Sequence, residues 1–171
     1  ITLYAKWTAN TYNITYVMDG GTNPSSNPTT FTYSESTQTK TIANPTKVGY
    51  DFGGWTVTNG SISGNTLTIN AGATSVTLTA NWNAQKYAIT YRDQGNAAFS
   101  GTHASGYPTQ HTYGTATTLK KASKTGYTFG GWFTSSNCSG TAVTRLGATA
   151  YTSGITLYAK WTANSGTAYT V

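Results

Sequence analysis

An internal repeat constrains this chain more than any other feature of its sequence. The decapeptide ITLYAKWTAN at residues 1–10 recurs without change at residues 155–164, and a looser copy lies at residues 76–82. The block Gly-Tyr-x-Phe-Gly-Gly-Trp occurs at residues 49–55 and again at residues 126–132. Both patterns return after 75 to 79 residues. A repeat of this length predicts an array of small units that share one fold.

The phase of the repeat divides the chain into four parts. We expect residues 1–10 to be the last strand of a preceding repeat and residues 163–171 to be a linker followed by the first strand of a following repeat. Between them, residues 11–83 form repeat unit A and residues 84–162 form repeat unit B. The linkers have only four to six residues, too few for a flexible tether. The sequence therefore predicts units joined as a semi-rigid rod.

Composition and alternation favour β-structure with little helix. Aromatic residues make up 13% of the chain, 13 residues are tyrosine, and only 8% of residues are charged. In residues 1–7 and 76–82, Ile or Val, Leu, Ala and Trp share one face, which is typical of a half-buried strand. Residues 61–69 predict a hairpin with Ile62 on one strand and Leu67 and Ile69 on the other. We therefore expect a mainly β protein.

The Gly-Tyr-x-Phe-Gly-Gly-Trp block is interpreted as a folding motif. Its consecutive glycines indicate either a positive φ or the close approach of another backbone segment. Its Trp and the Trp at the end of each repeat are expected to pack in the core. The predicted structural residues are Gly49, Tyr50, Phe52, Gly53, Gly54 and Trp55, then Gly126, Tyr127, Phe129, Gly130, Gly131 and Trp132, and finally Trp7, Trp82 and Trp161.

The sequence lacks the patterns that catalysis and metal binding require. Four acidic residues are too few and too scattered for a calcium loop or a pair of catalytic carboxylates, and two isolated histidines do not have zinc spacing. Cys138 lies in a small polar run that predicts a loop, and His103 and His111 are its only candidate partners for nucleophilic catalysis. We expect no enzyme activity, no catalytic residue, no metal and no cofactor.

The charge of the chain narrows the choice of partners. The formal net charge is +6, but the basic residues are scattered along the sequence and only Lys120 and Lys121 are adjacent. Because a nucleic-acid-binding face needs clustered cations, we expect no nucleic-acid partner. Weak attraction to anionic cell-wall polymers is left open. No apolar run reaches about 18 residues, so we expect no membrane insertion.

A binding role for glycans or host proteins remains open beside a structural repeat. Tyr4, Lys6, Tyr158 and Lys160 are predicted to point outward and are candidate surface contacts. They could serve a module that binds glycans or host proteins, in which two or three exposed rings should share one groove, whereas a stalk unit should have no such pocket.

Unit B also carries an insertion within residues 97–110, which predicts an exposed loop. Covalent crosslinks between side chains are not favoured.

Taken together, the ordered blocks Tyr-x-Ile-Thr-Tyr, Asp-x-Gly, Gly-Tyr-x-Phe-Gly-Gly-Trp and Ile-Thr-Leu-Tyr-Ala-Lys-Trp resemble the Listeria–Bacteroides repeat. This is the B-repeat type of internalin-like bacterial surface proteins. The resemblance implies tandem small β-grasp-like, ubiquitin-like sheet domains in extracellular arrays, and no catalytic residues. The low charge and the insertion at residues 97–110 depart from the usual pattern.

The resemblance and the residues together predict a non-catalytic structural and adhesive segment. We expect it to belong to a bacterial cell-surface or secreted fibre protein and to act as a semi-rigid stalk. Its expected partners are neighbouring repeats of the same chain, with self-association into fibres and binding to cell-wall or host glycans or proteins as further possibilities. The alternative is a dedicated glycan- or host-protein-binding module.

Overall fold

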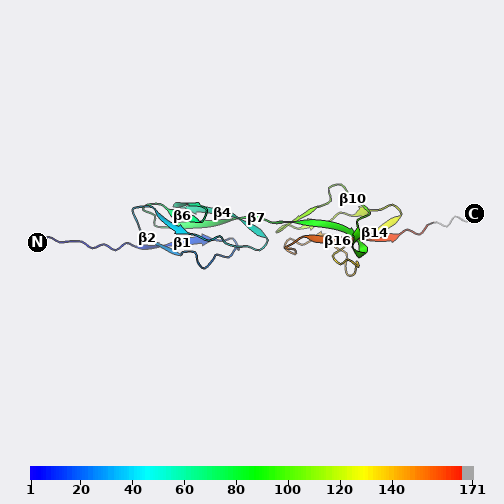
Figure 1. The fold of residues 1–171 in the computed structure, drawn as a ribbon, viewed down its shortest axis with the longest axis horizontal. Helices are drawn as coiled ribbons and strands as arrows, with labels where there is room; N and C mark the ends of the chain where they lie inside the picture. Colours follow the sequence, from blue (N-terminus) through cyan, green and yellow to red (C-terminus); the bar gives the residue numbers. More distant parts are fainter. Residues whose placement is uncertain (167–171) are drawn as a thin grey trace, which may run out of the picture. The chain divides into compact units, whose positions relative to one another are not determined.

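The chain folds into two compact units that divide after Asn83. The structure, a computed structural model, describes residues 1–166 (Figure 1). Both units are built mainly from strands, and the helical content of the described residues is one short 3₁₀ helix, η1 (Gln94–Asn96). The prediction of a mainly β protein with little helix is confirmed.

Unit A contains a four-stranded sheet in which the first and last strands lie side by side. The sheet has the order β2-β1-β7-β4. Its strands are β1 (Thr11–Val17), β2 (Thr30–Thr32), β4 (Tyr50–Thr58) and β7 (Val76–Ala84). β1 runs parallel to β7, with Ile14 opposite Val76 and Val17 opposite Thr79, and antiparallel to β2. The two central strands are thus separated by almost the whole unit in sequence.

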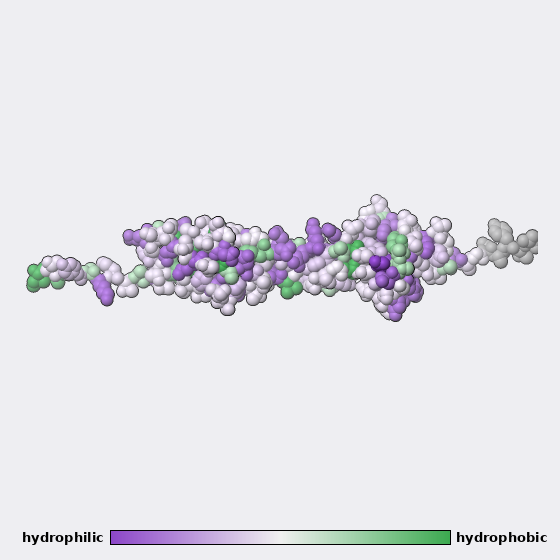
Figure 2. All heavy atoms as spheres, viewed as in Figure 1, coloured by the Kyte–Doolittle hydropathy of each residue, from purple (hydrophilic) through white to green (hydrophobic). Residues whose placement is uncertain are grey.

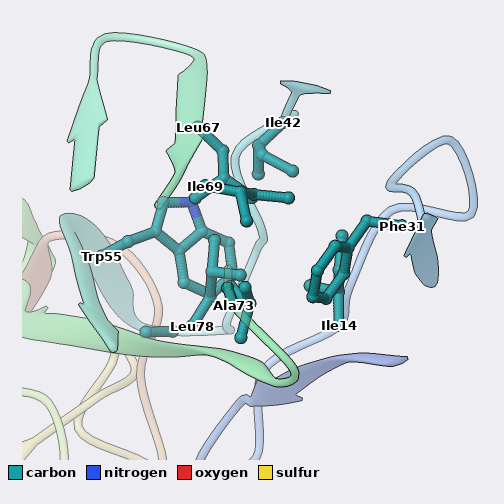
Figure 3. Packing of buried hydrophobic residues seen from close by; sticks show 10 residues of the cluster. Ile14, Phe31, Ile42, Trp55, Leu67, Ile69, Ala73 and Leu78 are labelled. Atoms are coloured by element: carbon teal, nitrogen blue, oxygen red, sulfur yellow. The ribbon is translucent and has the colours of Figure 1, made fainter. Parts of the chain in front are cut away.

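A second, three-stranded sheet completes the core of unit A. It has the order β3-β6-β5 and consists of β3 (Gln38–Thr41), β5 (Gly60–Ser63) and β6 (Thr66–Ile69). β5 and β6 form the predicted hairpin, with Ile62 opposite Leu67. Apolar side chains from both sheets meet around Trp55 (Figure 3). The buried residues of this core are Ile14, Phe31, Ile42, Trp55, Leu67, Ile69, Ala73, Val76, Leu78 and Ala80.

The main sheet of unit B has the same central parallel pair of first and last strands as that of unit A, with an additional short strand paired to it. This sheet has the order β11-β8-β16-β14, and β9 (Ala97–Ala98) also pairs with β8. The strands are β8 (Lys86–Asp93), β11 (Gln110–Thr112), β14 (Tyr127–Phe133) and β16 (Ile155–Ala163). β16 lies between β8, to which it is parallel, and β14, to which it is antiparallel.

Two short strand pairs stand where unit A has its three-stranded sheet and its first loop. β10 (Thr102–His103) pairs with β13 (Ala122–Ser123), and β12 (Thr117–Thr118) pairs with β15 (Arg145–Leu146). The core of unit B comprises Ile89, Leu119, Ala122, Trp132, Leu146, Ile155, Leu157 and Ala159. The second unit therefore keeps the central strands and reduces the covering sheet.

The two identical decapeptides have different structures. Residues 155–164 contain β16, in which Ile155, Leu157 and Ala159 are at most 4% exposed. Residues 1–10 form no strand, and Ile1, Leu3, Tyr4 and Trp7 are at least 88% exposed (Figure 2). The half-buried strand expected at residues 1–7 is therefore absent from this structure. The reason is physical, since a strand needs neighbours and β7 already occupies the corresponding position in unit A.

Two of the predicted chain divisions stay predictions. The role of residues 1–10 as the last strand of a preceding repeat stays a prediction, because no sheet among residues 1–166 includes them. The predicted first strand of a following repeat falls largely on residues 167–171, which lie outside the described residues.

The buried indoles should dominate the stability of each unit. Replacing Trp55 or Trp132 by Ala should destabilise its own unit by about 3–5 kcal/mol, because each ring fills a core that cannot collapse around the space left. Domains of this kind have about 5–15 kcal/mol in total, so urea unfolding followed by circular dichroism should show a clear loss. Trp7→Ala is the matched control and should change stability by less than about 0.5 kcal/mol. A Trp55→Ala protein that unfolds like the parent would refute the assignment.

Candidate functional site

The Gly-Gly-Trp block uses its two glycines for different purposes. The second glycine has a positive φ, 103° at Gly54 and 115° at Gly131, a region that disfavours other residues. The first glycine allows close approach, since a Cβ at Gly53 would lie 2.9 Å from the Asn83 side-chain nitrogen and 3.3 Å from the Asn81 carbonyl oxygen. Both expectations raised by the sequence are thus met, one at each position. The block turns Trp55 and Trp132 into the core, where they are 9% and 2% exposed.

The tryptophan at the end of unit A lies in a defined socket. Trp82 is half-buried and donates a hydrogen bond from Nε1 to the Met18 carbonyl oxygen at 2.9 Å. The Phe52 ring lies 5.7 Å from the indole, and the Lys47 ammonium lies 5.7 Å from its centroid. Gly21 is so close to the ring that a Cβ there would clash with it. We call Met18, Gly21, Lys47 and Phe52 the tryptophan socket of unit A.

Unit B contains the equivalent tryptophan socket around Trp161. Its Nε1 donates a hydrogen bond to the Asp93 carboxylate at 2.8 Å, and Phe129 lies 5.2 Å from the ring. Lys124 lies 5.8 Å from the ring centroid, and a Cβ at Gly101 would be 2.6 Å from the indole. The repeat-end tryptophans are therefore packed at the margin of the core and not within it.

Sequence reasoning missed the lysines of the two sockets. Lys47 and Lys124 each stand three residues before the Tyr of the block, and their ammonium groups lie 4.5 Å and 4.3 Å from the Tyr50 and Tyr127 rings. Cation–π attraction holds each lysine over two aromatic rings. The sequence did contain a signal for these lysines, because both repeats have Lys at the same position before the block.

Trp7 has no socket in this structure. It is 90% exposed, in contrast to the packing predicted for it, because residues 1–10 have no sheet to join. It lines a hollow of about 470 Å³ together with Tyr12, Tyr33 and Glu35. Tyr12 and Tyr33 meet edge to face at 6.5 Å. Three rings thus border one hollow, which is the arrangement expected of a glycan-binding groove.

The four predicted surface contacts fall into two environments. Tyr4 and Lys6 are exposed and lie outside any strand. Tyr158 is half-buried on β16, while Lys160 is exposed with its ammonium 5.9 Å from the Phe133 ring. The identical sequences therefore present their side chains differently.

The insertion of unit B is folded onto the core. His103 stacks between Phe99 at 4.2 Å and Tyr107 at 3.8 Å. The Tyr91 ring meets His103 edge to face at 4.7 Å, and its hydroxyl donates a hydrogen bond to the Pro108 carbonyl at 2.7 Å. Burial raises the pKa of Tyr91 to about 12, so the phenol stays protonated as this donor. Most residues of the stretch are exposed, as predicted for this insertion, but Phe99 and His103 are half-buried in an aromatic stack with Tyr107, which is 36% exposed.

The residues considered for nucleophilic catalysis have structural surroundings. His111 is fully buried and its Nδ1 lies 2.8 Å from the Thr117 hydroxyl, while its Nε2 has no partner. Cys138, expected in a polar loop, is 5% exposed, because a thiol packs as a small apolar group. Burial raises the pKa of this thiol, which disfavours the reactive thiolate. Within residues 1–166, no group of three or more His, Cys, Asp or Glu residues could hold a metal ion.

Comparison with known proteins identifies the repeat. The family model of the Listeria–Bacteroides repeat domain matches residues 12–81 and 87–160, so each match covers most of one unit. The chain belongs to this repeat family. The resemblance found in the sequence blocks is therefore confirmed for both units of the Listeria–Bacteroides repeat chain.

One relative is a protein of Evansella cellulosilytica whose name reads "Putative membrane protein". It is 31% identical over 172 residues, which is 95% of this chain and 24% of the relative. The chain thus spans about a quarter of that protein's length. No solved structure matches the chain significantly. Across the part that the structure describes, no helix has the length and hydrophobicity needed to cross a bilayer.

The socket lysine should contribute measurably to the unit that contains it. Lys47→Met keeps the aliphatic stem but removes the ammonium from the Tyr50 and Trp82 rings, so unit A should lose about 0.5–1 kcal/mol of unfolding free energy. Urea denaturation provides the measurement. Lys6→Met removes an exposed charge and should leave the transition unchanged. Equal effects of the two substitutions would show that only net charge matters.

The aromatic stack should make unit B sensitive to mild acid. Burial lowers the pKa of His103 from 6.5, so its full contribution to stability is present above pH 6.5 and is lost as pH falls from there through the lower folded value. The urea midpoint of unit B should therefore drop as the pH falls below about 6.5. His103→Phe should remove most of that drop, with amide signals of each unit as the readout. Unit A contains no histidine and serves as the internal control. An unchanged pH dependence in the variant would contradict the assignment.

Proposed function

We propose that this Listeria–Bacteroides repeat chain is a non-catalytic structural and adhesive segment of an extracellular bacterial surface protein, in which the units form a semi-rigid stalk. The observation that carries the proposal is that the residues shared by the two repeats are used for packing. Trp55 and Trp132 fill the cores, and Trp82 and Trp161 fill the two tryptophan sockets. What the repeats have in common is thus a way of folding and not a chemical site.

The position of the first and last strands supports a role in a linear array. Because β1 and β7 are parallel neighbours, the chain enters unit A at one end of the sheet and leaves at the opposite end. The same holds for β8 and β16 of unit B. Tension between the ends of a unit acts along these strands, so it loads their hydrogen bonds together in shear and does not open them one after another.

The short junction supports stiffness between units. β7 ends at Ala84 and β8 begins at Lys86, so only Gln85 separates the two strands. One residue cannot act as a flexible tether. Its carbonyl oxygen also accepts a hydrogen bond from the Tyr113 amide at 2.9 Å.

The predicted role of residues 1–10 and the predicted β-grasp-like fold are part of the same proposal. Residues 1–10 would be the last strand of a preceding repeat, in which Trp7 would occupy a tryptophan socket as Trp82 and Trp161 do. The decapeptide's identity with residues 155–164 supports this role. The central parallel pair of first and last strands supports a β-grasp-like relationship, with small covering sheets instead of a helix on the described core.

Glycan binding is the second candidate function. The hollow bordered by Trp7, Tyr12 and Tyr33 favours it, since aromatic rings around one depression suit a sugar ring. Trp7 is exposed there and the two tyrosines are half-buried. If residues 1–10 join a preceding sheet, Trp7 would leave this hollow. A stalk and a glycan-binding groove therefore make different use of the same indole.

Small-angle scattering tests the stalk. Proteins with two and four tandem units should differ in maximum dimension roughly in proportion to the number of units. Growth as the cube root of mass, typical of a compact body, would refute the proposal. As a matched control, about ten Gly and Ser residues inserted after Gln85 should make the particle more flexible and shift the distance distribution to smaller values.

A further inference from the structure

The net charge of the chain lies in one of its two units. Residues 1–83, which include unit A, contain three basic and three acidic residues and are neutral, whereas unit B contains seven basic residues and one acidic residue. The whole formal net charge of +6 therefore lies in unit B. Its basic residues are Lys86, Arg92, Lys120, Lys121, Lys124, Arg145 and Lys160. Sequence inspection of the whole chain had shown only scattered cations, because the neutral repeat diluted the signal.

The cations of unit B are not neutralised within the unit. Its single acid, Asp93, accepts hydrogen bonds from Trp161 and from the amide and hydroxyl of Ser100. The ion pair found among the described residues, Lys47 with Asp19 at 3.3 Å, belongs to unit A. The mutual repulsion of these cations is unfavourable. An external anion would relieve it.

Two of the cations lie beside an apolar hollow. Lys120 and Lys121 are exposed and line a hollow of about 290 Å³, whose other walls come from Phe129, Gly130, Gly131 and Trp132 of β14 and from residues 142–144. Arg145 is exposed on β15, the next residue along the chain. The hollow lies at the lower limit of ligand-site volumes, so it suits a single ring.

We infer that unit B binds an acidic polysaccharide, with a sugar ring against the hollow and its anionic substituents near Lys120 and Lys121. Lysine suits this partner because it is a mobile point charge that does not demand planar, bidentate geometry. The inference goes beyond the stalk and does not depend on it, since a single unit could bind in this way.

The same observations disfavour a nucleic acid. Binding of single strands needs several rings on which successive bases stack. The large exposed rings of the described part of unit B are Tyr107 and Tyr127, and Tyr127 is covered by the Lys124 ammonium at 4.3 Å. Insertion of a helix into the major groove is disfavoured, because the helical part of unit B is η1 alone among the described residues. The two-stranded pairs of unit B, β10-β13 and β12-β15, have only two residues in each strand.

The test uses the full chain and three defined probes. Polygalacturonate is the acidic polysaccharide, dextran is the neutral one, and a thymidine homo-oligonucleotide represents nucleic acid. Affinity is measured by calorimetry at about 50 and 200 mM NaCl, a range over which charge-driven binding weakens strongly. We expect binding to polygalacturonate, none to dextran, and weaker binding to the oligonucleotide.

Matched variants separate a local site from net charge. Lys120→Gln with Lys121→Gln removes two charges from unit B, and Lys6→Gln with Lys40→Gln removes two from residues 1–83. The first pair should weaken binding about fivefold per lysine and lower the salt dependence, as for lysines near other anionic surfaces. The second pair, of which Lys6 lies in the segment before unit A and Lys40 in unit A, should change affinity less than about twofold. The double variant also removes the hydrogen bond from Lys120 to the Ser105 carbonyl oxygen, and this loss can disturb the fold. Lys121→Gln alone keeps that bond and therefore serves as a second variant.

Three results would overturn the inference. Equal affinity for dextran and polygalacturonate would remove the role of charge. Equal weakening by the two variant pairs would show a diffuse field without a site. Tighter binding to the oligonucleotide than to polygalacturonate would replace the polysaccharide by a nucleic acid.

Discussion

Burial of one indole between two small strand layers is the interaction on which each unit depends. Units of about 75 residues bury only a modest fraction of their surface, so they have little stability in reserve. A Trp supplies more buried area than any other side chain, and here it meets the aliphatic residues of both layers (Figure 3). The Gly-Gly sequence before it turns the indole inward, and the block recurs in both units with one difference, at Asp51 and Thr128.

Sequence reasoning succeeded where the pattern is local. Alternation predicted β7 and β16, and the turn at Gly64 predicted the hairpin with Ile62 opposite Leu67. It failed for residues 1–7, because alternation describes which face a strand would bury and cannot supply the sheet that buries it. The same ten residues form a central strand in one place and remain exposed in the other. Context, and not propensity, decides between them.

The candidate sites were harder to predict because they depend on contacts distant in sequence. The hydrogen bond from Trp82 to Met18 spans 64 residues, and that from Trp161 to Asp93 spans 68. Likewise, the stacking of Phe99, His103 and Tyr107 arises only because the insertion folds back over Tyr91 and Trp132. A region rich in Gly, Ser and Pro reads as a loop when it is taken alone. The concentration of net charge in unit B was within reach of the sequence, because the repeat predicts the boundary between the units, but a count over the whole chain conceals it.

The central parallel pair of first and last strands also bears on how such chains grow. A unit whose chain enters at one end of its central strands and leaves at the opposite end can be duplicated in the gene without any change to its interior, since the copy begins where the original stops. Length then becomes a heritable variable that is independent of the fold. Each added copy is free to change its loops and its charge, as the neutral and the basic unit of this chain have done. Diversity accumulates on the surface while the strands that connect the copies stay the same.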